Sequence, residues 1–200
     1  MLAPKKIDYL QQKLDDVKSY FLLDSFKGEL GEYLSWDILD DLQRCYVRAY
    51  IALCHAEIES HFEQWATYII GEALRRWTME EKISLPLFSL FVHYKFMDAQ
   101  GAGTNQKVHQ IINEFKKSVV ERNHGIKEDN IRDLFRPLGV DDGTINSISP
   151  ALNSFGDKRG EAVHASIQVQ RPLDIPTLIS EIGYIQQGIR IFENTLEALF

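Results

Sequence analysis

The stretch that decides the fold is residues 47–69, VRAYIALCHAEIESHFEQWATYI. Apolar side chains recur in it at spacings of three and four residues, which is the period of an α-helix with one buried face. They are Val47, Ile51, Cys54, Ile58, Phe62, Trp65 and Ile69. The pattern predicts one long helix that begins near Ser35 or Asp37, ends near Trp77 and forms the centre of the fold.

The same period recurs along most of the chain. It predicts further helices over Pro4 to Phe21, Leu85 to Phe96, Thr104 to Val119, Lys127 to Leu138, Pro150 to His164 and from Pro176 onward. We find no convincing strand and no internal repeat. The prediction is an all-α, single-domain helical bundle over residues 36–200, preceded by a helical extension over residues 1–35.

Composition places the chain among ordinary globular proteins. It has 200 residues, 44% hydrophobic and 26% charged, which fits one domain with a substantial core. No apolar run is long enough to span a bilayer, and the first residues, MLAPKKIDYL, do not resemble a secretory signal. Cys45 and Cys54 lie in one predicted helix, about 13 Å apart, too far for a disulfide bond. We therefore expect a cytoplasmic protein without membrane association.

The charge is uneven along the chain. A net charge of −7 argues against a general nucleic-acid coat protein. Residues 107–171 are the one segment that is not acidic, with 10 basic and 9 acidic side chains. This segment is where a polyanion would bind, and Arg122, Lys127 and Lys158 are its candidate substrate-binding residues.

The sequence RGEAVH over residues 159–164 could carry phosphoryl chemistry. Histidine is a common general base in proteins, and His164 could take the proton of a ribose 2′-hydroxyl. Arg159 offers a permanent charge for the pentacoordinate phosphorus. No metal or other cofactor is needed for this reaction. An arginine and a histidine at this spacing are also compatible with a plain helix end.

A second interpretation is a metal site. Glu121 to His124 and Glu161 to His164 both have the pattern Glu-x-x-His, which di-metal carboxylate bundles use. The remaining ligands would come from Glu57, Glu59 or Glu193. Both motifs, however, lie near predicted helix ends, whereas such bundles place them in the middle of helices.

Polar side chains also flank the apolar stripe of the long helix. At about 100° per residue, His55, Glu59 and Glu63 share one flank, and Glu57 and His61 share the other. A partly buried carboxylate here needs a cationic partner. Arg159 is a suitable partner for Glu57 or Glu59.

Three stretches, in order, resemble the HEPN superfamily, and more narrowly its RiboL-PSP-HEPN branch. They are YIALCHAEIESHFE at residues 50–63, RNHGI at residues 122–126 followed by Asn130-Ile and Pro137-Leu-Gly-Val, and RGEAVH at residues 159–164. The last matches the defining motif of the superfamily, an arginine and a histidine separated by four to six residues. The resemblance covers about residues 40 to 200.

The resemblance implies an all-α bundle that often forms a homodimer, with the two Arg–His motifs facing across a shared cleft. Many members are metal-independent endoribonucleases of toxin–antitoxin, phage-defence or RNA-processing systems. Carried over, Arg159 and His164 would be the catalytic pair, RNA the substrate, and an antitoxin or other regulator a possible partner.

One position departs from the family pattern. Active ribonucleases of the superfamily often have a polar residue directly after the arginine, and this chain has Gly160. Either Glu161 or Asp157 substitutes for the polar residue as an accessory group, or the protein is catalytically weaker, or it is not a nuclease. Glu57 and Glu59 are further candidate accessory groups. The alternatives are a non-catalytic HEPN module that binds a protein or a nucleotide and, second, the di-metal carboxylate protein.

Overall fold

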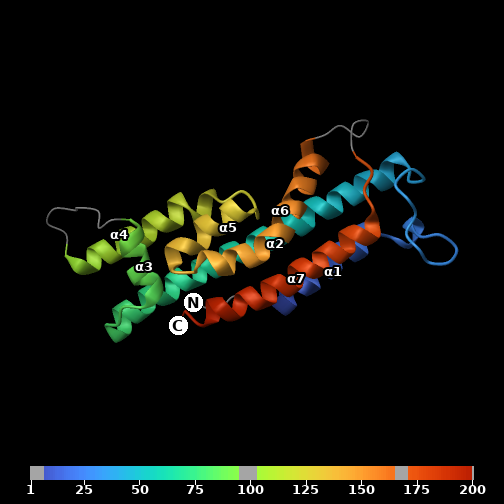
Figure 1. Ribbon diagram of the computed structural model, residues 1–200. Coiled ribbons are helices and arrows are strands. Elements are labelled where there is room, and N and C mark those ends of the chain that lie inside the picture. The colour runs from blue at the N-terminus through green and yellow to red at the C-terminus, as the bar shows by residue number, and fades with distance from the viewer. Residues whose placement is uncertain (1–6, 95–102, 165–170, 200) are drawn as a thin grey trace.

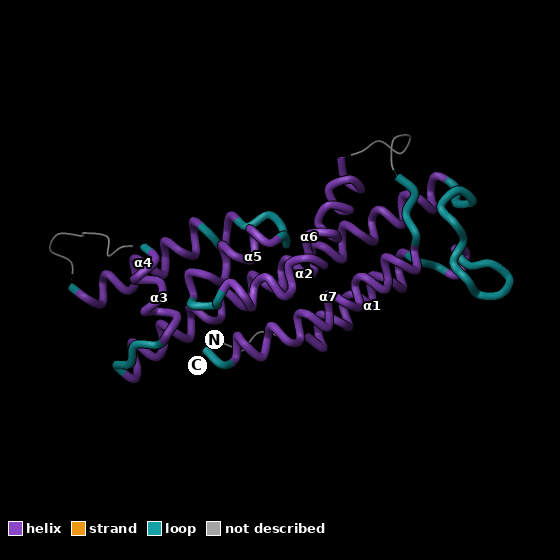
Figure 2. Tube along the Cα trace, viewed as in Figure 1, coloured by secondary structure: helices purple, strands orange, loops and turns teal. Residues whose placement is uncertain are grey.

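The computed structural model describes residues 7–94, 103–164 and 171–199. Figures 1 and 2 show an elongated bundle of helices, and the described residues contain no strand. The helices are α1 (Ile7–Phe21), α2 (Asp41–Glu80), α3 (Leu85–His93), α4 (Thr104–Ser118), α5 (Glu128–Phe135), α6 (Asp142–His164) and α7 (Ile175–Glu197). The predicted all-α class is confirmed.

The helix α2 is the axis of the fold, as its apolar stripe predicted. Its 40 residues correspond to about 60 Å. Its N-terminus carries a capping box, in which Asp40 and Gln43 each accept a hydrogen bond from the backbone of the other. The helix therefore begins at Asp41, later than the predicted Ser35 or Asp37, because the turn before it contributes Trp36 and Leu39 to the core.

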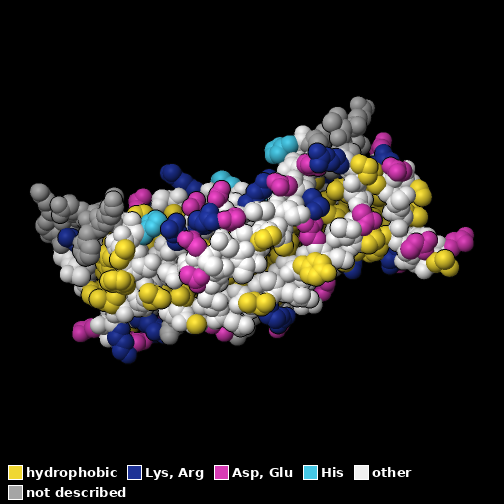
Figure 3. Space-filling model, in the orientation of Figure 1, with side chains coloured by type: hydrophobic (Ala, Val, Ile, Leu, Met, Phe, Trp, Pro, Cys, Tyr) yellow, Lys and Arg dark blue, Asp and Glu magenta, His cyan; other side chains and the backbone are white. Residues whose placement is uncertain are grey.

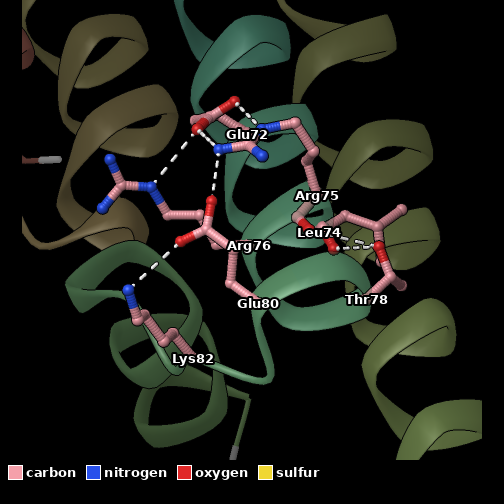
Figure 4. Close-up of polar contacts among 7 residues, drawn as sticks. All are labelled: Glu72, Leu74, Arg75, Arg76, Thr78, Glu80 and Lys82. Atoms are coloured by element: carbon pink, nitrogen blue, oxygen red, sulfur yellow. Dashed lines mark hydrogen bonds and ion pairs between the residues drawn. The ribbon is translucent and has the colours of Figure 1, made fainter.

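The C-terminus of α2 is fixed by charges on its own surface (Figure 4). Arg75 binds the carboxylates of both Glu72 and Glu80, at 2.7 and 2.8 Å. Arg76 approaches Glu72 from the other side at 3.2 Å. The helix then ends because Glu81 adopts the left-handed conformation, with φ of 53°.

The helices α1 and α7 lie side by side along α2 (Figure 1). Ile7, Leu10 and Leu14 of α1 are buried in the same hydrophobic core as α2 and α7. The carboxylate of Glu193, on α7, is also buried there, and it accepts hydrogen bonds from three donors on the two helices α1 and α2. The donors are the Ile7 backbone N–H at 3.2 Å, His61 Nε2 at 2.8 Å and Trp65 Nε1 at 3.0 Å. The predicted boundary at residue 35 stays a prediction, but α1 shares the main core.

The start of α6 was predicted wrongly. Ser149 and Pro150 look like a cap and a first-turn proline, but both lie inside a helix that begins at Asp142. The actual cap is Asp141, whose carboxylate accepts hydrogen bonds from the backbone N–H and the hydroxyl of Thr144. Pro150 is tolerated because it is on the exposed side of the helix, where the carbonyl it leaves unpaired can face water.

The helices α3, α4 and α5 cover the other end of α2 (Figure 1).

Both cysteines are free, Cys45 exposed and Cys54 buried. None of the helices described is both long and apolar enough to cross a membrane. The predicted helix boundaries at Pro4 and Phe96 lie outside the described residues.

Candidate functional site

Arg159 and His164 lie on the last two turns of α6. These turns rise from the side of the bundle, away from the line of the other long helices (Figure 1). Five residues correspond to about 140° of rotation and about 7.5 Å of rise, so the two side chains leave the helix in different directions. His164 is exposed, and Arg159 is half-buried.

Arg159 faces the polar flank of α2 that contains His55 and Glu59. Its guanidinium forms no hydrogen bond or ion pair with any described residue, but its charge acts on both of these side chains. Burial and, as a second cause, the charge of Arg159 together lower the pKa of His55 to about 4. His55 is therefore neutral at physiological pH, and its Nδ1 lies 3.6 Å from the Glu59 carboxylate.

Glu59 is the one predicted accessory carboxylate that the structure brings close to Arg159. Burial raises the pKa of Glu59, and the neighbouring charge of Glu63 raises it too. Arg159, His124 and a backbone hydrogen bond from Gly125 oppose the shift. The net shift is upward, so the carboxyl group holds a proton more readily than an exposed glutamate.

The turn over residues 123–125 also contacts this polar flank of α2. Asn123 is buried, and its amide donates to Glu63 at 3.0 Å and to the Gly125 carbonyl at 3.1 Å. A Cβ atom on Gly125 would come within 2.7 Å of the Asn130 side-chain oxygen, so a larger residue here would require that side chain to move. The turn holds His124 close enough for its charge to act on Glu59.

The predicted substrate-binding lysines are already paired. Lys158 donates to Glu181 and to Ser154, both at 2.9 Å. Lys127 forms an ion pair with Asp157 and lies so close to Gly156 that a Cβ there would contact its side chain at 2.9 Å. Arg122 is exposed. Charges of both signs also interleave on the surface seen in Figure 3.

The other predicted accessory groups are spread out. Asp157 is the partner of Lys127, and the exposed Glu161 lies 3.9 Å from Arg171. Glu57 is on the opposite flank of α2 from Glu59, and its charge acts on Cys54. At Gly160, an added Cβ atom would meet no atom of the described part of the chain within 4 Å, so a larger side chain would fit among these residues.

The residues proposed as metal ligands are not brought together. Glu193 is held by His61, Trp65 and Ile7, and Glu121 and Glu161 are exposed. The described ranges contain no group of three or more His, Cys, Asp or Glu side chains arranged to hold a metal ion.

Two residues of the site had no predicted role. Arg48, on α2, donates from Nε to the Ala162 carbonyl at 2.7 Å. Asn123 joins the 123–125 turn to Glu63. The only signal in the sequence is that Arg48, His55 and Glu59 fall on one helical face, because seven and eleven residues are close to whole numbers of turns.

The fold and the site together define a helical bundle with an Arg–x4–His motif beside a group of polar side chains on its longest helix. The sequence model of the RiboL-PSP-HEPN family matches residues 5–199. The chain therefore belongs to the RiboL-PSP-HEPN family. No curated protein and no solved structure matches it.

Proposed function

We propose that this protein is a metal-independent endoribonuclease that cuts single-stranded or looped RNA. The observation that carries the proposal is the pair of side chains at the end of α6, an exposed His164 and an Arg159 without an ion pair among the described residues. His164 removes the proton of a ribose 2′-hydroxyl, and the oxygen attacks the adjacent phosphorus. The bond from phosphorus to the 5′-oxygen of the next nucleotide breaks, which leaves a 2′,3′-cyclic phosphate, and the departing 5′-oxygen takes a proton from the imidazolium or from water. Arg159 stabilises the charge that develops on the phosphoryl oxygens. DNA lacks this hydroxyl and is not a substrate.

A homodimer makes this geometry more effective. Arg159 and His164 leave α6 in different directions, so the two side chains of one chain do not both point at a single phosphate. A second copy facing the end of α6 supplies the complementary group and doubles the positive charge. The proposed setting is a cytoplasmic toxin–antitoxin, phage-defence or RNA-processing system, with an antitoxin or another regulator as partner.

The neutral state of His55 supports a role for Arg159 in binding phosphate. A protonated His55 would repel Arg159 and attract the Glu59 carboxylate. With His55 neutral and the pKa of Glu59 raised, these two side chains leave much of the Arg159 charge available. Glu59 is then an accessory carboxyl group that the Arg159 charge reaches.

The test is cleavage of total RNA and of transfer RNA in EDTA. Wild-type protein is compared with His164→Ala and Arg159→Ala. Two matched controls are His93→Ala, which removes a histidine from the last turn of α3, and Arg190→Ala, which removes an exposed arginine of α7. We expect both site variants to lose at least about 100-fold in rate and both controls to keep the wild-type rate. Equal cleavage by all five proteins would refute the proposal.

A second candidate function is a non-catalytic HEPN module that binds a protein or a nucleotide. The observation that favours it is the pairing of the basic side chains that would attract RNA, since Lys127 and Lys158 both bind carboxylates. RNA affinity depends mainly on contacts to phosphates. If the folded wild-type protein cuts no RNA in the assay above, this function is preferred.

A further inference from the structure

The last turn of α6 is attached to α2 by one charged side chain. Of the final four residues, Ala162 is buried, and Glu161, Val163 and His164 are exposed. Apolar packing therefore holds this turn at one position only. The Arg48 Nε–H donates to the Ala162 carbonyl at 2.7 Å, a bond between residues 114 positions apart in the chain.

The bonded carbonyl lies in the last turn of α6, two residues before His164, the last described residue of this helix. Among the described residues, Arg48 is the hydrogen-bond donor found for it. The last four carbonyls of an α-helix lack an intrahelical donor, so a side chain at this end can supply one. A cation at this end also interacts favourably with the helix dipole. Arg48 thus caps the helix that ends in His164.

We infer that Arg48 is a positioning residue for His164. This role rests on the proposed ribonuclease function. Arg48 fixes the last turn of α6, and the His164 imidazole then meets the 2′-hydroxyl in a reactive geometry. Arg48 touches neither the substrate nor the reacting atoms. Displacing a catalytic group by about 1 Å can cost about 100-fold in rate, so a cap on this turn has a large effect on catalysis.

Two substitutions distinguish the effect of the Arg48 hydrogen bond to Ala162 from the effect of the Arg48 charge. In Arg48→Gln, the side-chain amide nitrogen is the same number of bonds from the backbone as Nε of arginine, so the variant keeps a donor for the Ala162 carbonyl without the charge. Arg48→Met has similar length and no donor. The matched control is Arg44→Met, one turn earlier on α2, because Arg44 also donates to backbone carbonyls, those of Trp36 and Asp37.

The first readout is amide hydrogen exchange in residues 160–164, which needs no activity. We expect exchange to become about tenfold faster in Arg48→Met and to stay near the wild-type rate in Arg48→Gln and Arg44→Met. Unchanged exchange in Arg48→Met would overturn the inference. If wild-type protein cuts no RNA, the proposed function fails, but this measurement still decides whether Arg48 caps α6.

The second readout is steady-state RNA cleavage. We expect Arg48→Met to lower kcat by about 10- to 100-fold with KM within about twofold of wild type, and Arg48→Gln to restore most of kcat. A raised KM with unchanged kcat in both Arg48 variants would mean that the charge binds RNA, and would overturn the positioning role. Arg44→Met should keep both constants.

Discussion

Acid should destabilise this protein through His55. Burial holds the pKa of His55 at about 4 in the folded chain, with Arg159 as a second cause, against about 6.5 in the unfolded chain. Between these two values the unfolded state binds more protons, so the free energy of unfolding falls as the pH falls. The contribution of neutral His55 to the free energy of unfolding is fully present above about pH 6.5 and is completely lost below about pH 4.

The size of the effect follows from the two pKa values. For a single group, the loss between about pH 7.5 and about pH 5 is about 2 kcal/mol. In a chain of 200 residues this corresponds to about 4–8 °C in melting temperature. The Glu59 carboxylate lies 3.6 Å from Nδ1 of His55. When ionised, it stabilises protonated His55 and so reduces the loss of stability at low pH. Glu59→Gln should therefore show at least the wild-type loss.

The assay is urea unfolding followed by tryptophan fluorescence at several pH values. Wild type is compared with His55→Leu, which fills a similar volume and does not titrate. We expect the wild type to lose about 2 kcal/mol more than His55→Leu over this pH range. Other acid-sensitive groups are common to both proteins and cancel in the difference. Equal losses, within about 0.5 kcal/mol, would show that His55 does not remain neutral and buried.

Three further outcomes test other parts of the molecule. Glu193→Gln should destabilise the protein by about 2 kcal/mol in urea unfolding, because three buried donors lose a charged acceptor. Burial alone would raise the pKa of Glu193, but the hydrogen bonds from His61, Trp65 and Ile7 outweigh it and lower this pKa. The difference in unfolding free energy between wild type and Glu193→Gln should therefore shrink as the pH falls through the acid range. A difference that does not change with pH would contradict the ionised, hydrogen-bonded state of Glu193. Gly160→Asn should leave the melting temperature within about 2 °C, since the position is open, and raise the rate of RNA cleavage severalfold; loss of cleavage would show that the site needs glycine. Glu81→Gly should stabilise the protein by about 0.5–1 kcal/mol in thermal unfolding, because glycine adopts positive φ without strain, and a destabilised variant would argue against the left-handed cap.

The centre of the fold could be predicted because its signal is local. The stripe from Val47 to Ile69 repeats over six turns, and no other structure buries residues at that spacing. The start of α6 could not be predicted in the same way. Ser149-Pro150 has the local pattern of a helix start, but Asp141 provides a cap upstream, and packing of Ile145 and Ile148 extends the helix across the proline.

The candidate site was predicted in part for the same reason. The Arg159–His164 motif is local, and its place at a helix end followed from the pattern. The contacts made by Arg48 and Asn123 join residues 114 and 60 positions apart. A single sequence contains no periodicity that relates such positions. The pairing of Lys127 and Lys158 with carboxylates was missed because it depends on the same long-range packing.

The hydrogen bond between the Ile7 backbone and Glu193 also sets an order of events during synthesis. The two residues are 186 positions apart. At about 5–20 residues per second, about 10–40 s pass after Ile7 is made before Glu193 exists. During this interval His61 and Trp65 lack their buried acceptor, and the apolar face of α1 has no α7 to cover it. A helix of 15 residues is marginal alone in water. The growing chain therefore exposes this face until its last helix is made, and chaperones that bind apolar segments would have most access to it then.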